Sequence, residues 1–312
     1  MVTVTTNIGL DDDATGLQTS SVGEPSVAAS TSTVFMTGNW YASRSGDRGA
    51  TWGVIDPFTE FPTDRGRFCC DQLVIYLPRQ RLWAWLLQYE QQGTSNIFRL
   101  AVSRTGASGS WRWWDIAPTD LNPSWTDAWF DYPDMAVSQG HLWVSFNQYD
   151  SNDTWRRAGI VRWPLAELAS ARPVTRRHWV TTSLGSLRLV QGAGTSMWFA
   201  GNIAASRSLH LFQWPDASDA VTKWQVKVGP WNDTDYTSST PGGGQWLSRL
   251  DDRITGGWRA GGQLGFLWSA GRATGRPHPY VRAVTISEQT LKVTAEPDLW
   301  SQNGAWAYPA AA

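Results

Sequence analysis

The sequence has little charge, little helical pattern and no long hydrophobic run. Only 17% of the 312 residues are charged, below the ~25% usual in soluble domains, and the formal net charge is −1. Such a chain has no global field that attracts nucleic acid or an anionic membrane, so we expect neither as a partner. The absence of any uncharged apolar stretch of about 18 residues argues against a membrane-spanning helix.

Cysteine is scarce, and its placement is unusual. The only two cysteines, Cys69 and Cys70, are neighbours, a spacing that fits no zinc or CxxC pattern. They either stay reduced, one on each side of a strand, or join in a strained ring that makes a rigid turn. The four histidines are not at equivalent positions of the repeat described below, so we expect no metal site and no cofactor.

The start of the chain lacks the basic and apolar regions of a signal peptide. This leaves a cytosolic protein or the mature form of a secreted one, and we expect the secreted form.

Aromatic residues are abundant, with 22 tryptophans and 41% hydrophobic residues overall. That is enough apolar material for a real core, which excludes wholesale disorder. Short runs of β-branched and aromatic residues alternate with Gly, Ser, Asn, Asp and Pro, a pattern typical of strands and turns. Only residues 164–171 have the pattern of a helix, so the sequence predicts an all-β protein.

One strand pattern recurs along the chain. Residues 34–39, 142–147 and 197–202 each contain an aromatic residue followed four positions later by Asn, and 82–88 and 264–269 are looser copies. Because side chains alternate between faces, positions four apart face the same side. The aromatic ring can therefore pack between sheets while the amide lies at the rim. Trp83, Trp143 and Trp198 occupy this core position.

Each copy has a small apolar strand upstream and further strands downstream, which makes a unit of roughly 45 to 65 residues. This organisation predicts a β-propeller of four-stranded antiparallel blades in a single domain, residues 1–312. Five units can be counted. The two ends, 2–6 and 305–309, could assemble a sixth, so five or six blades are possible. The units begin near Glu24, Cys70, Tyr132, Ser186 and Arg249.

Residues 45–52, Ser-Gly-Asp-Arg-Gly-Ala-Thr-Trp, match the pattern S-x-D-x-G-x-T-W. This segment resembles the Asp-box, or BNR repeat, of sialidase-like β-propellers. The resemblance implies a hairpin between the third and fourth strands, where Asp47 accepts turn amides, Gly49 takes a positive φ and Trp52 packs on the blade. Residues 103–111 are a degenerate copy without the Asp. In these families the box lies on the outer edge, which implies a structural role.

The resemblance also implies a connection with carbohydrate. Proteins with such boxes include sialidases, other glycosidases, polysaccharide lyases and non-catalytic sugar-binding modules. Catalytic sialidases carry an Arg-Ile-Pro motif that this sequence lacks, which argues against sialidase activity. We expect a monomeric carbohydrate-active enzyme, a glycoside hydrolase or polysaccharide lyase, that binds an oligo- or polysaccharide at the axial mouth. The alternatives are a lectin-like module and a protein-interaction platform. The unit entrances differ from one another, which favours one central site over repeated pockets.

The repeat selects candidate site residues, because strand entrances and second-strand ends meet at one mouth of a propeller. Hydrolysis needs two carboxyl groups, and a lyase needs a base and a cation. The catalytic candidates are Asp71, Asp131 and Asp134 for hydrolysis, and Tyr132 with Arg249 for a lyase. The ligand-binding candidates are Glu24, Asn39, Trp40, Cys69, Cys70, Gln72, Gln88, Asn147, Asn202, Trp246, Asp251 and Arg272.

Overall fold

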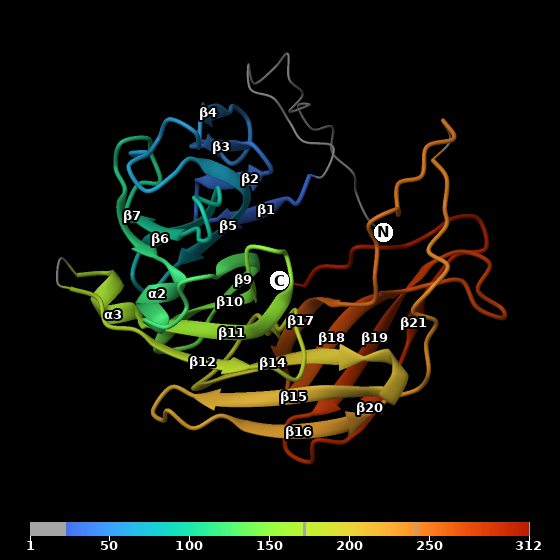
Figure 1. Ribbon diagram of the computed structural model, residues 1–312. Coiled ribbons are helices and arrows are strands. Elements are labelled where there is room, and N and C mark those ends of the chain that lie inside the picture. Colours follow the sequence, from blue (N-terminus) through green and yellow to red (C-terminus); the bar gives the residue numbers. More distant parts are fainter. Residues whose placement is uncertain (1–22, 171–172, 241, 312) are drawn as a thin grey trace. The chain divides into compact units, whose positions relative to one another are not determined.

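The computed structural model describes residues 23–170, 173–240 and 242–311, and these are built almost entirely from β-strands (Figure 1). The chain divides into two compact units, Met1–Pro133 with Tyr149–Thr154, and Asp134–Gln148 with Trp155–Ala312. Each unit is described by itself. The single domain expected from the sequence stays a prediction.

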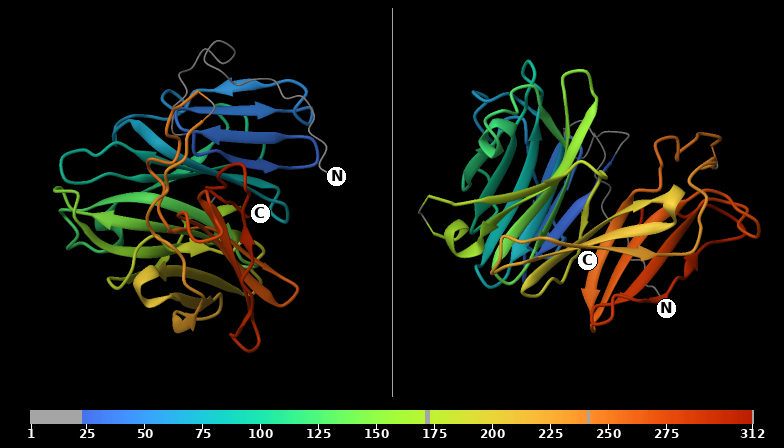
Figure 2. Two further views of the ribbon diagram at one scale, coloured as in Figure 1. Left: turned by 90° about the vertical axis from the view of Figure 1, so that its right-hand side faces the viewer. Right: turned by 60° about the horizontal axis from the view of Figure 1, so that its bottom comes forward.

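The first unit contains two four-stranded sheets whose strands follow chain order. The left view of Figure 2 shows the four strands of the first sheet side by side in blue. All the strand pairs recorded in these two sheets are antiparallel. The sheets are β1 (Ser26–Ala29), β2 (Val34–Gly38), β3 (Tyr41–Ser45) and β4 (Gly53–Ile55), then β5 (Phe68–Leu77), β6 (Leu82–Tyr89), β7 (Phe98–Ser103) and β8 (Arg112–Ile116).

Three further sheets lie wholly or mostly in the second unit and also follow chain order. The third sheet is β9 (Trp129–Val137), β10 (His141–Tyr149), β11 (Trp155–Pro164) and β12 (Arg177–Thr181). The fourth is β13 (Arg188–Leu189), β14 (Ser196–Ile203), β15 (Ser208–Pro215) and β16 (Thr222–Lys227). The fifth is β17 (Ile254–Ala260), β18 (Gln263–Ala270), β19 (Tyr280–Ser287) and β20 (Val293–Ala295), with β21 (Asp298–Leu299) also on β19.

The five sheets confirm the repeat of four-stranded antiparallel units. In the part of the chain that the structure describes, helix is confined to single turns: α2 (Pro118–Leu121), α3 (Leu165–Leu168) and the 3₁₀ turn η1 (Ala204–Ser206). The predicted helix at 164–171 is therefore shorter than expected, with Pro164 at its N-cap.

The core of each unit is made by tryptophans that alternate inward along the second strands. In the first unit Trp83 and Trp85 pack with Phe35, and in the second Trp143 packs edge-on against Trp214. Burying such rings removes about 150–250 Å² of surface each, so they dominate core energetics. Trp83, Trp143 and Trp198 are each at most 4% exposed, which confirms their predicted core positions.

The turn at residues 45–52 has the predicted geometry and joins β3 to β4. The Asp47 carboxylate accepts hydrogen bonds from the Thr51 amide at 2.8 Å and the Thr51 hydroxyl at 2.6 Å. Gly49 lies at φ 92°, where a side chain would be strained. The Trp52 indole donates to the Gly49 carbonyl at 3.1 Å. These hydrogen bonds hold the pKa of Asp47 at about 2.

The spare segment expected at 305–309 carries no regular strand, yet it is hydrogen-bonded to the fifth sheet. The Tyr308 amide donates to Ser269 Oγ at 3.2 Å, and Thr255 Oγ1 donates to the Pro309 carbonyl at 2.6 Å. The structure therefore attaches this segment to β17 and β18. Whether it belongs to a sixth blade stays a prediction.

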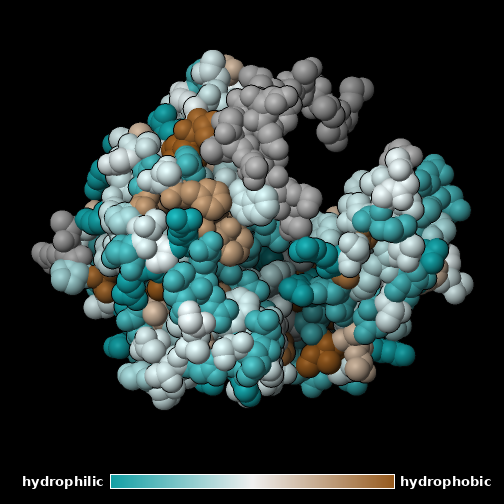
Figure 3. All heavy atoms as spheres, turned by 45° about the horizontal axis from the view of Figure 1, so that its top comes forward, coloured by the Kyte–Doolittle hydropathy of each residue, from teal (hydrophilic) through white to brown (hydrophobic). Residues whose placement is uncertain are grey.

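Few large hydrophobic side chains reach the surface. On the face shown in Figure 3 they form small separate groups among polar residues. Trp246, a predicted ligand-binding residue, is 41% exposed, and Trp306 is 55% exposed. In the described part of the chain, no helix has the length and apolar character needed to cross a membrane.

Candidate functional site

A bulge at the start of β5 sets up the candidate site. Phe68 pairs with Tyr89 and Gln72 pairs with Leu87, so the three residues from Cys69 to Asp71 oppose Gln88 alone. Extra residues in one strand leave the ladder and re-aim their side chains, a device common next to active sites. Cys69 and Cys70 are joined by a disulfide within this bulge, which confirms the vicinal disulfide over the reduced alternative.

The bulge brings Asp71 together with two other carboxyl groups. Asp71 is hydrogen-bonded to Glu24 and lies within electrostatic reach of Asp131. Burial raises the pKa of Asp71 well above its usual value, and the Glu24 and Asp131 charges raise it further. Neighbouring acids disfavour one another's ionised forms, so these contacts favour the protonated form of Asp71, whose carboxyl group is hydrogen-bonded to Glu24. Asp71 remains partly exposed and can be reached by a ligand.

Two amides orient the other two carboxylates. Asn39 Nδ2 donates to Glu24 Oε2 at 3.0 Å, and Gln88 Nε2 donates to Asp131 Oδ1 at 3.0 Å. Both amides are buried, at 6% and 3% exposed, yet Asn39 Oδ1 and Gln88 Oε1 have no hydrogen-bond partner. A buried acceptor without a donor costs free energy, so each such group calls for an explanation.

Backbone conformation also marks this region. Glu24, Trp40 and Tyr132 lie at φ 39°, 79° and 52°, in the left-handed region that residues other than glycine rarely adopt. Strain of this kind often occurs at functional sites. Trp40 directly follows Asn39, whose amide contacts Glu24, and is 37% exposed.

Other predicted residues of the same kind are engaged in holding strands together. Gln72 donates to the carbonyls of Gly38 and Tyr41 at 2.7 and 2.9 Å and accepts from the Trp85 indole. This buried amide thus joins β5 to the first sheet. Both N–H groups of the Gln72 amide are used in these contacts, and its oxygen has only one further lone pair. Little hydrogen-bonding capacity therefore remains for a ligand.

Asp134 also belongs to this structural group. Its oxygens accept hydrogen bonds from Arg188 Nη1 at 2.8 Å and from the Leu189 amide at 2.9 Å. Burial raises the pKa of Asp134, and Arg188 opposes that rise. The partners of Asp134 are thus an arginine and a backbone amide rather than another acid. Its catalytic role stays a prediction.

The asparagines at the ends of the second strands of the third and fourth sheets make similar internal contacts. Asn147 donates to Ser186 Oγ at 3.1 Å and accepts from the Ser186 amide at 2.8 Å. Asn202 donates to the Asp252 carbonyl. In these two copies, the Asn of the repeated sequence pattern therefore joins the second strand of one sheet to the entrance of the next sheet. Asn39 is the copy that contacts a carboxyl group instead.

The remaining predicted residues are in the second unit. Arg272 makes an ion pair with Asp235 at 2.8 Å, Asp251 pairs with Arg253, and Arg249 is exposed. Tyr132 lies in the first unit, so no lyase pair with Arg249 is defined. Among residues 23–170, 173–240 and 242–311, no group of three His, Cys, Asp or Glu is arranged to hold a metal ion.

The comparisons bear on the fold. No family model matches the chain, and no curated protein matches its sequence. Among solved structures, the chain is similar to Hadza microbial sialidase Hz136 (12% identity, 92% of this chain, 60% of that one, TM-score 0.55). It is also similar to the GH93 α-L-arabinofuranosidase of Fusarium graminearum in complex with arabinobiose (11% identity, 93% and 84%, TM-score 0.50).

A third similar structure is the polysaccharide lyase Uly1 (12% identity, TM-score 0.48), with 85% of this chain covered. The chain spans 58% of that protein and 60% of the sialidase. At these identities the likeness concerns fold alone. Together with the five sheets, the likeness to the sialidase and the arabinofuranosidase confirms the predicted β-propeller fold.

Proposed function

We propose that this propeller is a glycoside hydrolase whose site is the Glu24–Asp71–Asp131 cluster. The observation that carries the proposal is the placement of Asp71, a partly exposed carboxyl group that is hydrogen-bonded to Glu24 and close to Asp131, in surroundings that raise its pKa. Cleavage of a glycosidic bond uses one protonated carboxyl as acid and a second carboxylate as base or nucleophile. Environments that push neighbouring carboxyl pKa values apart assign these two roles.

Asp71 is the general acid in this proposal and protonates the leaving oxygen of the glycoside. Asp131 is the second carboxyl group in this proposal, because the Gln88 amide donates to its Oδ1 and holds it in place. The hydrogen bond between Glu24 and Asp71 raises the pKa of Asp71 and so favours its protonated form until the substrate oxygen replaces Glu24 as its partner.

Two surfaces beside the acids would hold the sugar ring. Trp40 offers an exposed aromatic face, and the partly exposed Cys69–Cys70 ring offers a small rigid apolar one. Sugars combine hydroxyls that hydrogen-bond with C–H faces that pack on apolar surfaces, which suits sites with few polar and several apolar groups.

We also propose a secreted location, supported by the vicinal disulfide, because disulfides persist mainly in oxidising compartments. The hydrogen-bonded turn at residues 45–52 supports its assignment as an Asp-box with a structural role.

The test is a panel of glycosides and polysaccharides that includes arabinobiose and sialosides, read for binding and for product. The Asp71→Asn variant should lose about 10²- to 10⁴-fold in turnover and keep its affinity, because only proton transfer is removed. Asp153→Asn is the matched control, since Asp153 is an exposed acid of the same unit outside the cluster. Full turnover by Asp71→Asn would disprove the proposed role.

The same panel separates the alternatives. Binding without any product from the wild-type protein would indicate a lectin-like module. An unsaturated product, detected by its ultraviolet absorbance, would indicate a lyase.

A further inference from the structure

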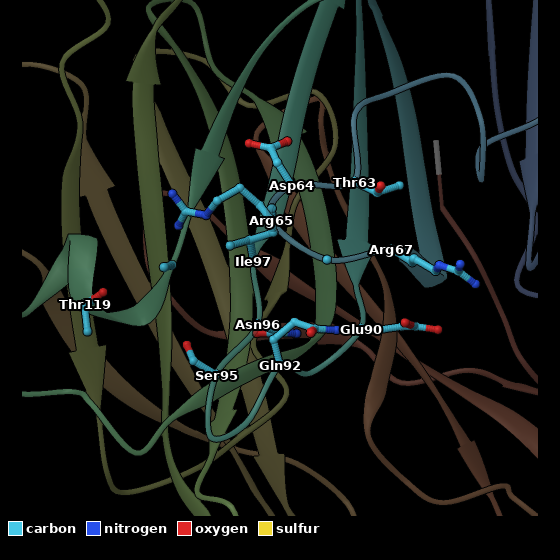
Figure 4. Close-up of a pocket in the computed structure, with 12 residues that line it drawn as sticks. Thr63, Asp64, Arg65, Arg67, Glu90, Gln92, Ser95, Asn96, Ile97 and Thr119 are labelled. Carbon is cyan, nitrogen blue, oxygen red and sulfur yellow. The ribbon is translucent and has the colours of Figure 1, made fainter.

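A pocket of about 620 Å³ lies in the first unit, lined by two loops, 63–67 and 90–97, and by residues near α2 (Figure 4). Its volume falls within the ~300–1,000 Å³ typical of small-molecule sites. None of its lining residues belongs to the Glu24–Asp71–Asp131 cluster.

The pocket and the cluster share one buried residue as a support. Asn96 lines the pocket and is 4% exposed. Its amide nitrogen donates to the carbonyls of Tyr89 and Phe130 at 3.2 and 2.8 Å, and its oxygen accepts from the Phe130 amide at 2.8 Å. Gln88 immediately precedes Tyr89, and Asp131 immediately follows Phe130. One side chain therefore fixes the pocket wall and the two strand ends that carry Gln88 and Asp131.

A second connection comes from the bulged strand. The Glu90 amide donates to the Arg67 carbonyl at 2.8 Å, just outside the Phe68–Tyr89 pair. Arg67 and Glu90 both line the pocket, and the bulge that carries Asp71 begins one residue after Phe68. Pocket and carboxyl cluster are thus at the same end of the β5–β6 hairpin.

The lining mixes donors and acceptors without a net charge. Arg65 and Arg67 are balanced by Asp64 and Glu90, and hydroxyl and amide side chains complete the wall. Within the described residues no ion pair occupies Arg65, and Figure 4 shows Arg65 and Arg67 extending in opposite directions from their loop. Such a lining suits the hydroxyls of an uncharged sugar better than an anion, which would need a field of one sign.

We propose that this pocket is a second subsite, which binds a neutral sugar unit next to the one held at the carboxyl cluster. The inference rests on the proposed function and deepens it: the substrate is an oligosaccharide of at least two units rather than a simple monosaccharide glycoside. Remote binding of this kind positions the reacting bond at the acid.

The test measures affinity for neutral mono-, di-, tri- and tetrasaccharides of the best series in the panel, by calorimetry, with the wild-type and Asp71→Asn proteins. Affinity should rise with chain length. The double variant Arg65→Ala/Gln92→Ala, which changes two exposed lining residues, should lose about tenfold in affinity for the longer sugars and little for the monosaccharide.

Arg79→Ala is the matched control, because Arg79 is an exposed arginine in the turn between β5 and β6, at the other end of that hairpin. Thr119→Trp, a second variant at an exposed lining position, should block the pocket sterically. Affinity that is independent of length, or unchanged in both pocket variants, would overturn the subsite. Length-dependent binding without turnover would instead retain the subsite and reject the hydrolase.

Discussion

Two aspartates, the partly exposed Asp71 in the first unit and the buried Asp134 in the second, have different roles because their neighbours differ. Asp71 in the first unit faces two other acids, whereas Asp134 in the second faces Arg188 and a backbone amide. Burial raises both pKa values, but only Asp134 has partners that oppose the rise. A buried carboxyl with a counter-charge holds strands together, while one among like charges is held ready to give up a proton.

The largest effect expected from this comparison is on the stability of the second unit. Arg188→Ala leaves Asp134 buried without its cation, which should cost about 3 kcal/mol in the free energy of unfolding. Urea denaturation measures the loss. The matched control is Arg253→Ala, whose ion pair with Asp251 is exposed and should contribute no more than about 1 kcal/mol. Equal losses for the two variants would remove the distinction between the pairs.

The second prediction concerns pH and Asp71. Because its pKa is higher in the folded state than in the unfolded chain, the folded state binds the proton more tightly. Stability should therefore be fully retained below the ordinary Asp pKa and fall as pH rises towards the folded pKa. Asp71→Asn cannot ionise, so it should unfold at a higher temperature than wild type at pH 7 but not at pH 3.5.

A thermal unfolding series across pH makes this comparison, with Asp153→Asn as the exposed control. If Asp71→Asn lowers the unfolding temperature at neutral pH, the Asp71 carboxyl group does not destabilise the folded state. The contrast with Asp134 would then be lost.

The smallest effect on stability is expected at the disulfide. A bond between neighbouring residues closes almost no loop, so Cys69→Ser/Cys70→Ser should change the free energy of unfolding by less than about 1 kcal/mol. Turnover should nevertheless fall several-fold, because the bulge that aims Asp71 loses its constraint. Kinetics with the double variant and with reduced wild type should agree, and unchanged turnover in both would assign the bond no role in positioning Asp71.

Much of the architecture could be read from the sequence. Alternation along each strand determines which side chains face inward, so the recurring aromatic–Asn pattern was sufficient to predict the units and the buried Trp83, Trp143 and Trp198. The turn at 45–52 was equally predictable, since Asp47, Gly49 and Thr51 make local contacts within a few residues.

The site was predictable only in part. The rule that site residues lie at strand entrances selected Glu24, Asp71 and Asp131. The same rule also selected Asp134 and Gln72, whose side chains hold strands together. No local pattern distinguishes a carboxyl that will meet another acid from one that will meet an arginine, because the partner comes from a distant part of the chain. The pocket residues Arg65 and Gln92 were missed, since their loops lie outside the repeat and carry no motif.

The sequence by itself therefore determined the all-β repeat, its cores and its outer turn, because these depend on side-chain alternation and short-range hydrogen bonds. Only the tertiary structure decided that Cys69 and Cys70 are bonded, that Asp71 leaves the ladder, and that Glu24 and Asp131 meet it there. The reason is physical: a pKa depends on the charges and solvent around a group, and those come from residues far apart in the chain.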